Sequence, residues 1–250
     1  MSSIAISLVV FACVFGGAML GMFIHLRLPK EHLSADSKEA VRLAMGVVAT
    51  TVALVLGLLV GSAKSFYDAG NTAITQLAAD AVLMDRVLVH YGPETQEARV
   101  VLRGSVVHLV EFKGANRSAR TRFDPQAAER DTLYDKIEQL SPGNENQRRL
   151  RGQALELAAQ VGHTRWLMFE QKAIPLPTPL LAMLVFWLAM LFVSFGMFVR
   201  PNAVVVTSLL VSALALAGAI LLIAEMYEPY GGLIQVSDAP LRAALAQLMH

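Results

Sequence analysis

Four stretches of the chain carry no Asp, Glu, Lys or Arg, and each is long enough to cross a membrane as a helix. They cover residues 1–26, 43–63, 173–199 and 201–224. The hydrocarbon layer of a bilayer is crossed by about 20 apolar residues in helical conformation. The pattern therefore predicts four transmembrane helices, near Ile4–His25, Leu43–Ala63, Pro179–Val199 and Ala203–Ala224.

Between the second and third predicted spans, apolar residues recur with the period of an α-helix. Leu77, Ala81, Met84, Leu88 and Tyr91 follow one another at alternating intervals of four and three, which places them on one helix face. This helix follows the second span without a strong break, so we expect the two to form one continuous rod.

Three more helices are predicted before the third span. Gly92-Pro93 ends the helix that carries Leu77 to Tyr91, and Asp124-Pro125 is typical of a helix start, with proline in the first helical position. Ser141-Pro142 marks the next end. The predicted helices cover about residues 94–113, 124–140 and 145–171.

These elements predict an all-α membrane protein in which a helical stalk domain separates two transmembrane hairpins. Residues 1–63 form the first hairpin, and residues 64–175 form the stalk domain between spans two and three. Residues 176–225 form the second hairpin, whose helices are joined only by Arg200-Pro201-Asn202. Residues 226–250 form a C-terminal amphipathic tail.

The tail is predicted to end in a short helix with one apolar side. Asp238 and Pro240 open it, and Leu241, Leu245 and Leu248 recur on one face. Such a helix can lie on a membrane surface or pack against the protein. We expect packing against the stalk, because the polar face holds one arginine and lacks the basic cluster that attracts a helix to lipid.

Composition and charge narrow the classes of function. Of 250 residues, 55% are hydrophobic and 16% charged, against roughly 25% charged in soluble domains. This excludes a soluble globular enzyme and a disordered chain. The formal net charge of +1 gives no electrostatic basis for nucleic-acid binding. Basic residues are divided almost evenly between the two ends of the spans, so they do not decide the orientation in the membrane.

The sequence offers little for catalysis. It contains no phosphate-binding loop, no zinc-protease motif and no nucleophile elbow, and its six histidines lack the spacing of metal ligands. Cys13 lies inside the first span and is the only cysteine, so it has no disulfide partner within the chain. We therefore expect no enzyme activity, no catalytic residue, no cofactor and no metal site.

Small residues form a strip along one side of the second span. In lipid, close backbone approach through small residues is a main source of helix packing. The first span carries a Gly-x-x-x-Gly pair of the same kind. We interpret both as helix-packing faces, in the first place between helices of one subunit; the residues are Gly17, Gly21, Gly46, Thr50, Ala53, Gly57 and Gly61.

A different face of the second span combines hydroxyl and aliphatic side chains. It carries Thr51, Val55, Leu58, Ser62 and Phe66. A ring of such faces around an axis forms an apolar constriction with polar mouths, which can gate ions by dewetting. The alternative is that this face meets lipid or another span. No ionisable residue lies at the centre of any predicted span, which argues against a proton relay or a charge-coupled transporter.

Several segments resemble one family. The chain is similar to the bestrophin-like family of unknown function, which is distantly similar to bestrophin channels. The resemblance covers most of the chain and is carried by Ala49–Val60, Met84–Leu88, Tyr91–Glu94, Pro229–Gly232 after Glu225, and Val236-Ser237.

The resemblance implies two spans, a cytosolic helical region, two more spans and a cytosolic tail. It also implies a homo-oligomer, with a pentamer favoured, whose second span lines an ion pore. Ser65-Phe66 followed by Asn71 is similar to a segment after the second span of bestrophins, which mostly conduct anions. The chain departs from that segment at Tyr67-Asp68, where a basic residue is expected.

The resulting hypothesis is a homo-oligomeric, multi-pass ion channel of the bacterial inner membrane. Its partners are further copies of itself, lipid and ions, and its termini and residues 64–175 are cytoplasmic. Two alternatives stay open. One is a membrane sensory or binding module with a four-helix ligand domain, and the other is a scaffold or stator-like subunit that needs a second chain.

Overall fold

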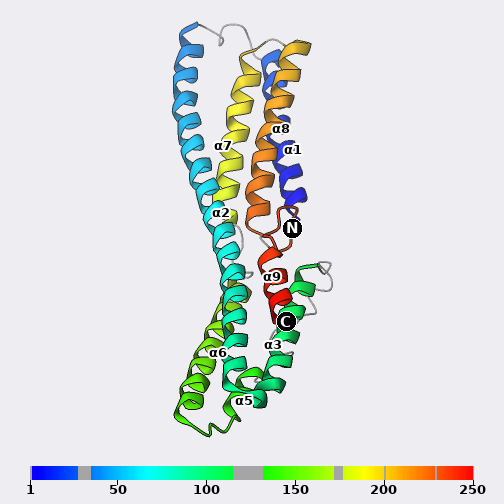
Figure 1. Cartoon of the computed structure of the whole chain (residues 1–250). Helices are drawn as coiled ribbons and strands as arrows, with labels where there is room; N and C mark the ends of the chain where they lie inside the picture. The colour runs from blue at the N-terminus through cyan, green and yellow to red at the C-terminus, as the bar shows by residue number, and fades with distance from the viewer. Residues whose placement is uncertain are drawn as a thin grey trace. The chain divides into compact units, whose positions relative to one another are not determined.

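The computed structural model describes residues 2–27, 35–114, 132–171, 177–199, 201–228 and 230–249, and these are helical apart from short turns and loops (Figure 1). The predicted all-α class is therefore confirmed. In chain order the helices are α1 (Ser3–Arg27), α2 (Ala35–Tyr91), the 3₁₀ helix η2 (Pro93–Thr95), α3 (Gln96–Gly114), α5 (Thr132–Glu138), α6 (Glu145–Gln171), α7 (Thr178–Met197), α8 (Ala203–Met226) and α9 (Ala239–Leu248).

Among the residues that the structure describes, four helices are long and apolar enough to cross a membrane. They are α1, α7, α8 and the segment Glu39–Tyr91 of α2, which confirms the four predicted spans and indicates a multi-pass membrane protein. The predicted second span and the first stalk helix belong to a single element, because α2 runs for 57 residues.

The described residues divide into two compact units. The membrane unit comprises Met1–Tyr67 and Pro175–Glu228, and the stalk unit comprises Asp68–Ile174 and Pro229–His250. In the membrane unit, α1 packs against both α7 and α8, and the three helices run side by side (Figure 1). Apolar side chains from all four spans form its core, among them Val14 of α1, Leu59 of α2, Leu184 of α7 and Ile220 of α8.

Glycines allow α1 and α7 to approach each other closely. A Cβ atom at Gly17 would lie 2.9 Å from the carbonyl oxygen of Ala189, and one at Gly21 would overlap the backbone of Val193. On α7, a Cβ at Gly196 would overlap the carbonyl of Ala18. Gly17 and Gly21 therefore lie where α1 and α7 approach each other closely.

Two hydrogen bonds between side chain and backbone also link the spans of the membrane unit. The hydroxyl of Ser7 in α1 donates to the carbonyl oxygen of Ala217 in α8 at 2.8 Å. At the other end of α1, Nδ1 of His25 donates to the carbonyl oxygen of Met197 at 2.8 Å. His25 therefore joins the end of α1 to the end of α7 through a hydrogen bond.

The stalk unit has its own apolar core. Met84 of α2, Leu102 of α3, Ile137 of α5 and Ala154 of α6 are buried in it. Helix α9 packs against α3, and Leu248 is buried in the same core. The tail therefore packs against the stalk helices, as its sequence predicts.

A glycine ends α2 where the sequence predicts. Gly92 has a φ of 138°, a conformation that residues with a Cβ rarely adopt. The hydroxyl of Thr95 donates to the carbonyl oxygens of Leu88 at 2.7 Å and of Gly92 at 2.8 Å, which satisfies acceptors left open at the helix end. Prolines mark the start of α7, with Pro177 at the N-cap and another proline in its first turn.

The other stalk helices follow the predicted boundaries closely. Helix α6 has the predicted bounds, and α3 begins two residues later than predicted because η2 precedes it. The predicted helix over residues 124–140 appears as α5, Thr132–Glu138; its predicted start at Asp124-Pro125 lies outside the described residues.

Ion pairs join the stalk helices. Arg99 of α3 donates two hydrogen bonds to the carboxylate of Asp85 in α2, at 2.7 and 3.0 Å, and this contact raises the pKa of the guanidinium. Nζ of Lys136 in α5 donates to Glu97 of α3 at 2.6 Å and lowers the pKa of that carboxyl. The first pair is bidentate and partly shielded from water, so it orients α3 on α2 better than an exposed pair does.

Candidate functional site

The span part of α2 presents three different faces, because successive residues of a helix are about 100° apart around its axis. One face is buried. Val52, Leu59 and Ala63 are 5%, 1% and 0% exposed and belong to the core of the membrane unit. This face attaches α2 to the other three spans.

The strip of small residues lies on a second face, centred about 140° from the buried one. A Cβ atom at Gly46, Gly57 or Gly61 would meet no atom within 4 Å among the described residues. Thr50 and Ala53 are exposed as well. The structure therefore does not place this strip against another described helix of the same chain, as the interpretation within one subunit required, and its packing role stays a prediction.

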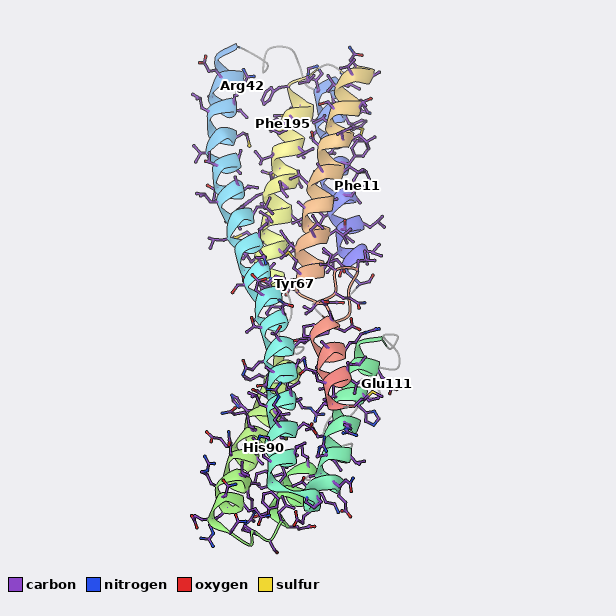
Figure 2. All side chains as sticks on the ribbon, in the orientation of Figure 1. Phe11, Arg42, Tyr67, His90, Glu111 and Phe195 are labelled. Carbon is purple, nitrogen blue, oxygen red and sulfur yellow. The ribbon has the colours of Figure 1, made fainter. Side chains whose placement is uncertain are left out.

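Large apolar side chains project next to the strip. Leu43, Val47, Leu54 and Leu58 are all exposed, Leu58 by 73%. Figure 2 shows the row of side chains along α2 between Arg42 and Tyr67, the two labelled residues at the ends of this segment. Contiguous apolar surface of this kind meets lipid or another protein surface.

The predicted pore face is the third face, and its first part is open. Thr51 is exposed, and its hydroxyl donates to the carbonyl oxygen of Val47 one turn earlier, at 3.0 Å. Leu58 is exposed on the same side, whereas Val55 is half-buried and packs at the edge of the core. This face of α2 therefore lies between the side that packs against the other spans and the side that is exposed.

The second part of that face contacts one residue just beyond α8. The hydroxyls of Ser62 and Tyr227 are 3.0 Å apart and share a hydrogen bond. The ring of Phe66 stacks on the ring of Tyr227, with centroids 5.5 Å apart and planes 28° apart. Tyr227 therefore holds two of the five predicted pore residues against the end of the fourth span.

Tyr227 was not singled out from the sequence as a partner of this face. Its place directly after the fourth span is typical of a tyrosine at the membrane interface. The sequence contains one signal for this contact. The second and fourth spans end at the same side of the membrane, because two spans separate these ends, so Tyr227 could be expected near the end of the second span. Gly196 of α7, the partner surface of Gly21, was missed in the same way.

Residues typical of catalysis or metal binding are not brought together. Among the residues that the structure describes, no three His, Cys, Asp or Glu side chains lie close enough to hold a metal ion. Cys13 is exposed on α1 and forms no disulfide. The candidate functional site is therefore the surface of the span part of α2.

Comparison with known families agrees with this architecture. Residues 12–241 match the bestrophin-like domain, which is nearly the whole chain. The chain belongs to the bestrophin-like domain family. The resemblance that the sequence motifs indicated is thereby confirmed. Neither the comparison with curated proteins nor that with solved structures found a match for this bestrophin-like protein.

Proposed function

We propose that this bestrophin-like protein assembles as a homo-oligomer around α2 and conducts ions across the bacterial plasma membrane. The observation that carries the proposal is the division of α2 into a covered and an uncovered side. Leu59 is buried against the other spans, while Leu58, its neighbour in sequence, is 73% exposed. A lone protomer would present that surface, glycines included, to lipid.

The order of the three faces around α2 fits a ring of copies. The strip of small residues lies about 140° from the buried face on one side, and the predicted pore face lies about 80° from it on the other. If a neighbouring copy covers the strip around Gly57 and Gly61, the side that carries Thr51 and Leu58 is directed towards the axis. Small residues allow the close approach that such a contact needs in lipid.

The chemistry of the inward side suits a hydrophobic gate. In the proposed pore, Val55 and Leu58 narrow the path, and the hydroxyls of Thr51 and Ser62 hydrate its two ends. An apolar constriction of this kind blocks ions by excluding water until it widens. Phe66 continues the lining beyond Ser62, and its stacking on Tyr227 fixes its orientation.

The decisive experiment is to purify the full chain, determine the mass and symmetry of the particle, and measure ion flux from liposomes. We expect several identical copies around a central axis, five by the family resemblance, with α2 facing the axis and with flux above that of empty liposomes. A single protomer, or an axis filled by lipid with α2 turned outward, overturns the proposal.

The proposed orientation places the termini and residues 64–175 in the cytoplasm. Ser141 and Asn202 are both exposed, and a Cys13→Ser background removes the only native cysteine. We expect an impermeant maleimide to label Asn202→Cys in intact cells, and to label Ser141→Cys only after the cells are permeabilised.

The same labelling distinguishes the sensor alternative. Modification of Ser141→Cys in intact cells supports a periplasmic ligand-binding bundle and contradicts the channel orientation. A scaffold or stator-like subunit predicts instead that the purified chain needs a second protein. A conducting particle that contains this chain alone argues against that alternative.

A further inference from the structure

Asp80 is a buried carboxylic acid in the stalk part of α2. The membrane unit includes α2 up to Tyr67, and the stalk unit begins at Asp68, so Asp80 lies outside the span part of the helix. It is 3% exposed, and Leu77 one turn before it and Met84 one turn after it are buried on the same side of α2. Aspartates are almost never buried to this extent unless they are paired.

The carboxyl group of Asp80 has one hydrogen bond among the described residues. Nε2 of Gln76, one turn earlier on α2, donates to Oδ1 of Asp80 at 3.0 Å. The other oxygen, Oδ2, is buried and has no hydrogen-bond partner among these residues. An ionised carboxyl in this position gives up the water around Oδ2 without a replacement, and this costs more free energy than burying the neutral acid.

Asp85, five residues later on the same helix, is buried with a cation. It is 8% exposed, and Arg99 of α3 donates to both of its carboxylate oxygens, at 2.7 and 3.0 Å. A bidentate pair of this kind replaces the water that a carboxylate loses on burial. The stalk part of α2 therefore buries one aspartate that is held as an ion pair and one that is not.

The helices that share the stalk core with α2 do not supply a cation to Asp80. On α9, Arg242 bonds to Asp238. None of the described charged side chains forms an ion pair with Asp80, and burial raises the pKa of its carboxyl, while the hydrogen bond from Gln76 opposes that rise. The charged side chains of α2, α3, α5 and α6 that are buried or half-buried in the stalk, besides Asp80, are Asp85, Arg99, Arg103, Asp135, Lys136, Arg151 and Arg165.

We propose that Asp80 is a proton-binding site that makes the packing of α2 in the stalk depend on pH. With the carboxyl protonated, Asp80 adds no charge to the stalk core. When the proton passes to bulk water, a negative charge is left in the core, and opening of the surrounding segment of α2 to water relieves its cost. The proposal does not depend on ion conduction or on assembly, because helices of one chain bury Asp80.

The direction of the pH dependence follows from proton linkage. Where the segment is open to water, an aspartate ionises at about pH 4, whereas the buried carboxyl keeps its proton to higher pH. Its stabilising contribution is therefore fully present below about pH 4 and is lost as the pH rises towards the pKa of the packed state. Since one proton is released on opening, the opening equilibrium constant rises by up to about tenfold per pH unit in this window.

Hydrogen exchange of the full chain in nanodiscs, measured by mass spectrometry, tests the proposal. Asp80→Asn keeps the size of the side chain and the acceptor for Gln76 but cannot ionise. Comparing chains at the same pH cancels the intrinsic pH dependence of exchange. In peptides around residue 80, we expect Asp80→Asn to exchange like the unmodified chain at about pH 4 and several-fold more slowly at about pH 8. Glu156→Gln is the control, since Glu156 is an exposed carboxyl on α6, and it should match the unmodified chain at both pH values.

Infrared spectroscopy detects the bound proton itself. At about pH 5.5 an ordinary aspartate is almost fully ionised, so the unmodified chain should show a band of protonated carboxyl that is weaker in Asp80→Asn. Gln76→Leu keeps the test informative if Asp80→Asn does not fold. Gln76 is exposed, and without its hydrogen bond to the charged form the loss of protection should move to higher pH. An unchanged infrared band in Asp80→Asn, or equal exchange of the unmodified chain and both variants at every pH, overturns the proposal.

Discussion

Two glycine-containing helices of the membrane unit have similar motifs and opposite surroundings. Gly17 and Gly21 of α1 lie against the backbone of α7, where an added Cβ would meet Ala189 and Val193. Gly57 and Gly61 of α2 have the same spacing, and a Cβ at either would meet nothing within 4 Å among the described residues. The motif by itself therefore does not tell which helix a span packs against.

The difference follows from what the opposite surface offers. Helix α7 presents Gly196 opposite Ala18 of α1, so small residues meet from both sides and the backbones approach closely. In lipid, burying apolar surface between helices gains little, and close packing must supply the attraction. The strip of α2 has no such surface in its own chain among the described residues.

The largest expected effect is on protein stability, at the Gly17 and Gly21 motif that packs against α7. Gly21→Leu should prevent folding or destabilise the membrane unit by about 3 kcal/mol or more, because the new side chain would have to displace the backbone of Val193 in α7. Thermal unfolding of the purified protein, followed by circular dichroism, measures the change. Gly16→Leu is the control on the same helix, since a Cβ at Gly16 would meet no atom of the described residues within 4 Å. Similar melting of both variants would contradict the packing of α1 on α7.

The next effect should separate assembly from folding. We expect Gly57→Leu and Gly61→Leu to melt like the unmodified protomer but to lose the oligomeric mass, because a bulky side chain on the strip prevents a neighbouring helix from approaching. Native mass spectrometry at equal protein concentration measures the fraction assembled, again with Gly16→Leu as the control. If both strip variants keep the full mass, α2 does not use this strip between copies.

The elements of the fold could be predicted from the sequence because lipid and water impose different local patterns. Charge-free windows located the four spans, and a 3.6-residue period with Gly92-Pro93 and the run from Ser141 located the stalk helices. These signals are local, since each depends on the residues of one element alone.

Contacts between distant elements could not be predicted in the same way. The pairing of Ser62 and Phe66 with Tyr227, the close approach of Gly21 to α7, and the burial of Asp80 in the stalk each depend on two or more elements. Periodicity gives the face on which a residue lies but not the element that faces it. For the same reason the five predicted pore residues have three different surroundings. Thr51 and Leu58 are exposed, Val55 is half-buried at the edge of the core, and Ser62 and Phe66 contact Tyr227.

An intermediate effect is expected at the uncovered side of α2. Leu58→Ala should raise the single-channel conductance in planar bilayers several-fold, because a shorter side chain widens the proposed constriction and admits water. Val60→Ala is the matched control. Val60 is also exposed, by 45%, but lies about 160° around the helix from Leu58. Unchanged currents for Leu58→Ala in a protein shown to conduct would remove Leu58 from the pore.

The smallest expected effect tests how the end of α2 is held. Tyr227→Phe removes the hydroxyl that bonds Ser62 and keeps the ring that stacks on Phe66, so it should cost about 0.5–1.5 kcal/mol of unfolding free energy. Ser62→Ala removes the same hydrogen bond from the other side. The double variant should therefore be no less stable than the less stable of the two single variants. Chemical denaturation in a double-mutant cycle can measure this.

Strictly additive losses in that cycle would mean that the two hydroxyls do not interact. Tyr227→Leu provides the complementary comparison, because it removes the aromatic stack as well and should cost more than Tyr227→Phe by about 0.5–1.5 kcal/mol. If the stack fixes Phe66 in the proposed pore, Tyr227→Leu should also change conductance, while Tyr227→Phe should change it little. Equal effects of the two variants on conductance would assign the positioning of α2 to the hydrogen bond rather than to the ring.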